Sequence, residues 1–172
     1  MNPFLYTFFL LACLASAPAA ELLANPGLNA GASSWTLPTG ISSVVDGAVL
    51  GQAGPVLRIS ATAAGWHMAN QWSLPLPVEA KRLKLSARVK TADIIPGASE
   101  WDRPRLMVLF HDATGAQASV IGAVEIPAGD GWRDIAGTVA VPPGMQSVSF
   151  CIGLHNCTGT LWISSPSCQP VD

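Results

Sequence analysis

The sequence predicts an all-β protein built as a sandwich or a barrel. Helical periodicity is nearly absent after the first twenty residues, apolar and polar residues alternate in short runs, and Gly, Pro, Asn and Asp separate these runs. The 172 residues are typical of one domain, and a hydrophobic content of 49% suffices for a substantial core. These features favour antiparallel sheets that bury one face each.

Nine runs are expected to form the strands. The clearest is 82–90, where apolar residues alternate with Lys, Arg and Ser, so that one face meets the core and the other meets water or a ligand. Residues 106–110 are apolar on both faces, which indicates a central strand. The other expected strands are 41–45, 56–60, 66–74, 118–126, 135–141, 148–154 and 160–163. Long loops are expected at 92–104 and around 115–131, and turns at 25–27, 51–55, 112–115 and 142–144.

The first twenty residues have the pattern of an export signal. Residues 4–14 form an apolar run that is too short to span a bilayer, and small residues follow up to Ala20. The expected domain boundaries are therefore 1–20 for a signal peptide and 21–172 for the sandwich, in a secreted or periplasmic bacterial protein. The residues before Cys13 resemble a lipobox, so a lipid anchor at Cys13 stays open as the alternative. No later stretch is long and apolar enough to predict a membrane span.

Charge and cysteine content narrow the possible partners. The net charge is −2 and Lys and Arg cluster only within 81–90, so nucleic acid is not an expected partner. Three cysteines follow the signal, and in an oxidising compartment the favoured disulfide joins Cys157, in a turn, to Cys168, in the terminal tail. Cys151 lies within a strand-like run, where a buried thiol is the simplest interpretation. The spacing lacks a Cys-x-x-Cys pair, so we expect no zinc site.

Six segments, in order along the chain, resemble carbohydrate-binding modules of families four, nine and twenty-two. They are 22–35, with its Asn-Pro-Gly turn and Trp, and 56–60, 83–90, 101–115, 132–142 and 159–163. The resemblance implies a jelly-roll sandwich with galactose-binding-domain-like topology, and a carbohydrate ligand. These families hold a structural calcium ion with acidic residues, but Asn29 and Ser164-Ser165 stand at the matching places here. Because calcium prefers carboxylates, we expect no bound calcium and no other cofactor.

Tryptophans are the main candidates for sugar binding, because pyranose rings stack on flat aromatic faces. Trp66 and Trp72 would share one face of a strand with Asn70 between them, which would form a sugar platform unless this face belongs to the core. Trp101 lies in a Pro-containing loop, where a tryptophan is hard to bury. The remaining tryptophans, Trp35, Trp132 and Trp162, match structural anchors of the resembling families, and we expect them to pack in the core.

Three further polar residues are candidate ligand contacts, namely Arg88, Arg105 and His111. Arg88 and Arg105 are expected to project from the face opposite the core, where a guanidinium group can bind a uronate or a pair of hydroxyls. His111 ends the central strand and His155 ends the strand 148–154, so both are expected at one rim. The sequence thus predicts a non-catalytic module that binds a poly- or oligosaccharide through exposed tryptophans on a concave sheet face or loop rim.

Two other functions stay open at this point. A sandwich with an apolar patch or a free edge suits a structural or protein-interaction module of the cell envelope. A small glycoside hydrolase or polysaccharide lyase is less favoured: Glu100, Asp102, Asp112 and Glu125 show no spacing that selects a catalytic pair. A lyase would use His111, Arg105 and an acid, and no other catalytic motif is present.

Overall fold

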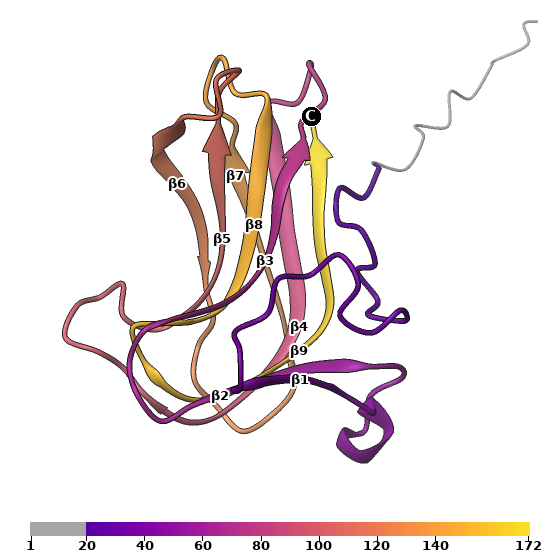
Figure 1. Ribbon diagram of the computed structural model, residues 1–172, viewed down its shortest axis with the longest axis vertical. Coiled ribbons are helices and arrows are strands. Elements are labelled where there is room, and N and C mark those ends of the chain that lie inside the picture. The colour runs from indigo at the N-terminus through magenta and orange to yellow at the C-terminus, as the bar shows by residue number, and fades with distance from the viewer. Residues whose placement is uncertain (1–19) are drawn as a thin grey trace, which may run out of the picture.

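The chain folds as two antiparallel β-sheets packed face to face, as Figure 1 shows. This computed structural model describes residues 20–172, except for the side chains of Ser119 and Val120. The strands are β1 (Ser42–Val45), β2 (Val56–Ala61), β3 (Trp66–Pro75), β4 (Arg82–Ile95), β5 (Pro104–His111), β6 (Gln117–Glu125), β7 (Arg133–Ala140), β8 (Ser147–His155) and β9 (Thr158–Val171), with the 3-10 helix η1 (Gly47–Leu50) after β1. The five-stranded sheet has the order β1-β2-β9-β4-β7, and the four-stranded sheet the order β3-β8-β5-β6.

All nine predicted strands are present, and they form a sandwich of two sheets, which confirms the predicted fold class. The last strand is much longer than predicted, because β9 lies between β2 and β4 and pairs with β4 along most of its length. Within residues 20–172, no helix has the length and apolar character needed to cross a membrane. The predicted signal peptide up to residue 19 and the predicted lipid anchor at Cys13 lie outside the described residues.

The core fills the space between the two sheets. Alternate residues of β4, β5 and β8 point inward and are fully or almost fully buried. They are Leu83, Leu85, Ala87 and Val89 of β4, Leu106, Val108 and Phe110 of β5, and Val148, Phe150, Ile152 and Leu154 of β8. Each large apolar side chain buried here contributes about 1.5–3 kcal/mol. The residues between them along each strand face outward and form the outer surfaces of the two sheets.

The segment before β1 closes one edge of the sandwich. The Trp35 ring packs edge-on against Phe150 at 6.0 Å between centroids, which confirms its predicted place in the core. Thr36 then forms a two-bond bridge with Asn70 of β3. The Gln71 side chain continues this contact by bonding both the amide and the carbonyl of Ala24. These contacts cover the free edge of β3 at Asn70 and Gln71, which disfavours edge-to-edge association at its middle.

The predicted disulfide between Cys157 and Cys168 is wrong, because all three described cysteines are free and buried. Cys157 directly precedes β9, whereas Cys168 lies near the other end of that strand, opposite Leu85. An extended strand advances about 3.3 Å per residue, so roughly 35 Å of strand separates the two, whereas a disulfide needs Cα atoms about 4.4–6.8 Å apart. The expected terminal tail is in fact the second half of a strand.

The buried thiols predict that the free energy of unfolding falls as the pH rises above about 9. Burial raises the pKa of Cys151 and Cys168 to about 12 and that of Cys157 to about 11. Thiols of the unfolded chain ionise near pH 8.5, so above that pH the unfolded state loses protons that the folded state keeps. Each thiol then lowers the unfolding free energy by up to about 1.4 kcal/mol per pH unit.

Denaturant titrations between pH 8 and pH 10 measure this slope. The Cys168→Ala variant removes one of the titrating thiols and should show a shallower slope than the original protein. Equal slopes for the two proteins would contradict the prediction, as would an unfolding free energy that stays constant over this pH range.

Candidate functional site

Three tryptophans are exposed at the outer surface of the four-stranded sheet. Trp66 and Trp72 lie on β3 and are 47% and 50% exposed, and Trp101, in the loop between β4 and β5, is 50% exposed. On β3, Ala69 points into the core, so the alternate residues Trp66, Met68 and Asn70 face outward. The alternative in which this face of the strand belongs to the core is therefore wrong.

An apolar floor lies on this outer surface. Met68, Met107, Leu109 and Cys151 are buried and form a small hydrophobic cluster separate from the main core. They come from β3, β5 and β8, at positions that alternate with core residues. Because these side chains are buried, they form a second, smaller core on this side of the sheet, and this core supports the residues around it.

The loop that carries Trp101 is held in place by hydrogen bonds to one carbonyl oxygen. The backbone oxygen of Trp101 accepts from the backbone amide of Arg103 at 2.9 Å and from Nε of Arg105 at 3.0 Å. It also lies 2.9 Å from Nδ1 of His155, which donates when the proton is on that nitrogen. A loop backbone held by several bonds loses little entropy when a ligand binds, so these bonds preorganise the segment that carries the Trp101 ring.

Asp102 anchors the same loop from its other side. Its carboxylate accepts from the amide of Ser99 at 2.9 Å and from the side chain of Asn156 at 3.2 Å. The hydrogen bond from the Ser99 amide is the main cause that lowers the pKa of Asp102, so this carboxylate stays ionised. Gly97 is required beside it, because a Cβ there would lie 2.5 Å from the backbone oxygen of Asn156.

Arg105 supports Trp101 from below. Its guanidinium lies 4.2 Å from the centre of the Trp101 ring and donates to the backbone oxygens of Glu100 and Trp101. The residue is only 7% exposed, and burial lowers the pKa of Arg105, although not enough to remove its charge. One face of the Trp101 ring is thus occupied by the guanidinium, and the opposite face is left for a ligand.

A cavity of about 450 Å³ opens beside this pair. It is lined by Glu100, Trp101, Arg103, Arg105 and Glu125. Arg103 and Glu125 form an ion pair at 2.9 Å across the end of β6, and the hydrogen bond from Arg103 to Glu125 raises the pKa of Arg103. Two arginines and two glutamates balance in charge, so the cavity suits a neutral polar ligand.

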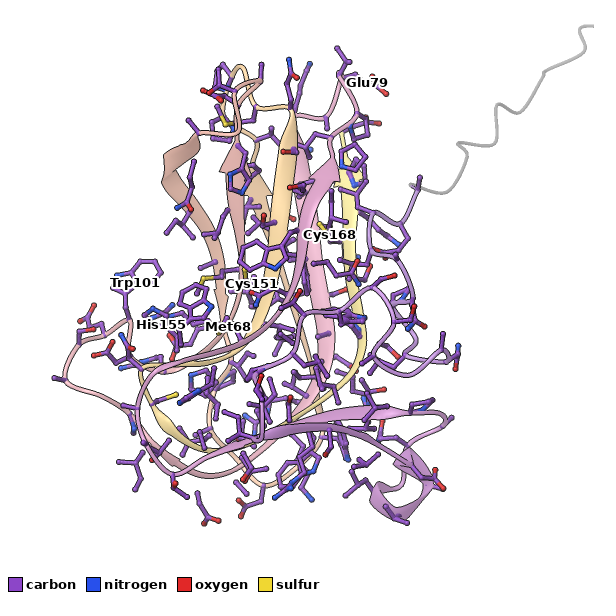
Figure 2. The ribbon with its side chains drawn as sticks, in the orientation of Figure 1. Met68, Glu79, Trp101, Cys151, His155 and Cys168 are labelled. Carbon is purple, nitrogen blue, oxygen red and sulfur yellow. The ribbon has the colours of Figure 1, made fainter. Side chains whose placement is uncertain are left out.

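Trp66 and Trp101 lie at the same end of the sheet. Trp66 pairs with His155 of β8, and the two rings meet edge-on at 5.5 Å, while His155 contacts the Trp101 carbonyl. Figure 2 shows Trp101, His155 and Met68 together on this side of the molecule. Trp72 lies six residues farther along β3, roughly 20 Å away at about 3.3 Å per residue.

Two buried polar atoms at this surface have no hydrogen-bond partner. Among the described residues, the buried side-chain atoms left unpaired are Oδ1 of Asn70 and Nε of Arg103. Asn70 lies between Trp66 and Trp72 and donates through Nδ2 to the carbonyl of Met68 at 2.8 Å. Unpaired buried groups are costly and rare in native proteins, and a bound hydroxyl or an ordered water would satisfy both.

Two predicted ligand contacts do not join this group. Arg88 lies on the other sheet, where it pairs with Asp134 at 3.0 Å and bonds Gln52. His111 faces the same side as Arg105 but lies at the opposite end of β5, where it bonds Ser149 at 2.9 Å. The expectation that His111 and His155 share a rim is wrong, because β5 and β8 are antiparallel and each residue ends its own strand.

Trp132 and Trp162, which were expected to pack in the core, are only partly buried. Trp132 is partly buried and donates from Nε1 to the carbonyl of Leu50 at 3.0 Å, so it ties β7 to η1 at the rim of the core. Trp162 is not in the core: it lies on the outer face of the five-stranded sheet, under the ammonium group of Lys90. The residues on either side, Leu161 and Ile163, take the inward positions.

The residues that match the calcium site of the resembling families do not fit that ion. Ser164 and Ser165 offer neutral hydroxyls 3.5 Å apart, and Ser164 lies opposite Arg88, whose positive charge opposes a cation. Asn29 lines a different hollow, where Asp46 is the only carboxylate. Calcium needs several carboxylates or carbonyl oxygens directed at one point.

The fold and the site define a jelly-roll sandwich with an aromatic surface on one sheet. The chain has the fold of the galactose-binding-like carbohydrate-binding modules. The sequence matches no protein-family model and no curated protein.

Among solved structures, the enzymatically active domain of tailspike protein 4 of bacteriophage CBA120 is similar with a TM-score of 0.65 and 15% identity over 88% of this chain. This chain spans 21% of the length of that solved chain. A family 16 carbohydrate-binding module is similar with a TM-score of 0.60 and 15% identity, over 88% of this chain and 99% of the module. The CBM22-1 xylan-binding domain from Paenibacillus barcinonensis Xyn10C has a TM-score of 0.58 and 14% identity, over 92% of this chain and 99% of that domain.

Proposed function

We propose that the protein is a non-catalytic module that binds a neutral oligo- or polysaccharide on the outer surface of its four-stranded sheet. The observation that carries this proposal is the set of three half-exposed tryptophans at one surface, together with unpaired buried polar atoms of Asn70 and Arg103. Exposed aromatic rings offer stacking faces for pyranose rings, and unpaired polar atoms offer bonds to hydroxyls.

The positions of the aromatic residues favour an extended ligand. Trp66 and Trp101 flank one end of the surface, and Trp72 lies roughly 20 Å away along β3. The buried cluster of Met68, Met107 and Cys151 lies between them. A chain of several sugar units would span the distance from the Trp101 cavity to Trp72, whereas a monosaccharide would contact only one end.

The arrangement of acidic residues supports binding rather than catalysis. Asp102 is committed to Ser99 and Asn156, and its pKa is lowered, which is the opposite of what a general acid requires. Glu125 is paired with Arg103. The lyase arrangement of His111 and Arg105 is not formed, because six residues of β5 separate them by roughly 20 Å.

We expect Trp66→Ala and Trp101→Ala each to weaken glycan binding about tenfold, since a buried aromatic contact contributes about 1–2 kcal/mol. Affinity electrophoresis in gels that contain xylan, β-1,4-galactan or mannan first identifies a ligand, and calorimetry with its oligosaccharides then measures the dissociation constant. The control is Val49→Ala, at an exposed apolar residue of η1 away from the four-stranded sheet, which should bind as tightly as the original protein.

The outcomes separate the remaining functions. Unchanged binding in both tryptophan variants would contradict the proposed site, and failure to bind any neutral glycan of a broad array would contradict the proposed ligand class. Sustained release of reducing ends from a polysaccharide would show an enzyme instead. Self-association in sedimentation without glycan binding would favour the envelope interaction module.

A further inference from the structure

The outer face of the five-stranded sheet carries most of the positive charge of the protein. Over residues 82–90 of β4, side chains alternate between core and solvent, and four of the five that face outward are basic. Arg58 of β2 lies in one row with Trp162 and Lys90 across the sheet. The basic face is defined here as Arg58, Arg82, Lys84, Arg88 and Lys90, which are five of the nine Lys and Arg residues in a chain of net charge −2.

Few carboxylates neutralise this face. Asp134 of β7 pairs with Arg88 at 3.0 Å, and Glu21 lies at the sheet edge, bonded to Ser167 and to the amide of Cys168. The residues of β9 that pair with Lys84 and Lys90 are Gln169 and Trp162, both uncharged. The basic side chains other than Arg88 thus have no ion-pair partner among the described residues.

The charges lie in one line along β4. Residues on one face of a strand repeat about every 7 Å, so the outward side from Arg82 to Lys90 presents two pairs of cations, on either side of Ser86, along roughly 25 Å. Trp162 lies beside this line with the ammonium group of Lys90 5.5 Å from its ring centre. A shallow hollow of about 330 Å³ lies at the middle of this line, and its polar lining consists of Lys84, Ser86, Ser165 and the Arg88–Asp134 ion pair.

Hydroxyl groups accompany the cations. Ser60 and Thr160 meet at 2.9 Å next to the Arg58 row, and Ser86, Ser165 and Ser167 lie along β4 and β9. Large apolar side chains are scarce on this face, where Trp162 is partly buried. The face therefore offers charge and hydrogen bonds rather than apolar groups that would insert into a lipid bilayer.

We propose that this basic face binds a linear polysaccharide whose sugar units carry carboxylate groups. Arg and Lys side chains bind carboxylates through charge-assisted hydrogen bonds, the serine and threonine hydroxyls bond sugar hydroxyls, and Trp162 offers part of an aromatic ring. The line of cations along β4 complements a chain that carries negative charges at intervals along its length. This surface is separate from the tryptophan surface on the other sheet, and the proposal does not depend on the function of that surface.

The test compares polygalacturonate with its highly methyl-esterified form, which has the same backbone without the charge. We expect affinity electrophoresis at low salt to show retardation by polygalacturonate, loss of most of it at high salt, and little retardation by the ester. The Lys84→Gln/Lys90→Gln variant should bind polygalacturonate about tenfold more weakly, since two exposed charge contacts are removed. An unchanged melting temperature shows that this variant is folded.

A second variant shows whether the weaker binding comes from the loss of charge on this face or from the change in the net charge of the protein. Ala113→Glu/Ala116→Glu changes the net charge by the same two units at the exposed β5–β6 turn, and it should bind like the original protein. Equal weakening by the two variants would overturn the proposed face. Absence of retardation by polygalacturonate would also overturn it, as would equally tight binding of DNA or of phosphatidylglycerol vesicles. The Trp66→Ala and Trp101→Ala variants should keep polygalacturonate binding, which distinguishes this proposal from the tryptophan site.

Discussion

Replacement of Gly153 by Ala is expected to lower the free energy of unfolding by about 3 kcal/mol. Gly153 lies in β8 between Met68 of β3 and Arg105 of β5. A Cβ at this position would collide with the backbone oxygen of His67 and lie 2.8 Å from Cα of Met68. Because the obstacles are backbone atoms of a neighbouring strand, they cannot move without shifting the sheet, and overpacking of this kind costs about 1–3 kcal/mol or more.

Thermal and chemical unfolding measure this effect, and we expect the melting temperature to fall by about 10 °C for a domain of this size. Gly131→Ala is the matched control, since a Cβ added at Gly131 would meet no atom within 4 Å and this residue does not adopt a positive φ. This control should stay within about 0.5 kcal/mol of the original protein. Equal stability of the two variants would show that β3 and β8 are not as close as described.

Replacement of Arg105 by Met is expected to reduce both stability and glycan binding, by about 2–3 kcal/mol of unfolding free energy and more than tenfold in affinity. The guanidinium is buried, bonds the carbonyls of Glu100 and Trp101, and supports the Trp101 ring. Hydrogen bonds from a charged donor contribute about 1.5–3 kcal/mol, and their loss leaves the Glu100 carbonyl without this donor. The loop would then no longer hold Trp101 in one orientation.

Hydrogen exchange of residues 96–103 tests the positioning role, because Arg105→Met should speed exchange there while the exchange of β8 stays slow. Arg105→Lys keeps the positive charge near Trp101 but lacks the forked donors that reach two carbonyls. We therefore expect Arg105→Lys to recover only part of the affinity. Full recovery by lysine would show that charge alone matters, and unchanged exchange in Arg105→Met would show that Arg105 does not position the loop.

The sequence predicted the strands well because their alternation is a local property. The apolar residues of β4 and the turn residues between strands determine which side chains face the core. The exposure of Trp101 agrees with its expected place in a loop. The sequence left open whether Trp66 and Trp72 face the core, and the position of Ala69 in the core shows that they face outward. The polar second half of β9 was missed, because it is ordered by pairing with β4 rather than by its own composition.

The local sequence pattern could not predict the direction of each strand or the sheet to which it belongs. Arg88 and Arg105 both face away from the core, as predicted, but they lie on different sheets. Arg103 and Glu125, which line the cavity beside Trp101, were not predicted as ligand contacts, because their proximity depends on the pairing of β5 with β6. One signal for the hydrophobic cluster on the outer side of the sheet was present in the sequence. Met107 is apolar although it occupies an outward position between the inward residues Leu106 and Val108.

The position of β9 has a consequence for the order of folding. This last strand lies in the middle of the five-stranded sheet, between β2 and β4, and Leu22 near the start of the described chain bonds the carbonyl of Cys168 within it. The sheet is therefore not complete until residues near 170 are available, and its pairings join segments more than a hundred residues apart. Such long-range contacts make folding slow, on the order of milliseconds to seconds, and we expect a chain that ends before Thr158 to remain unfolded rather than to form a smaller sandwich.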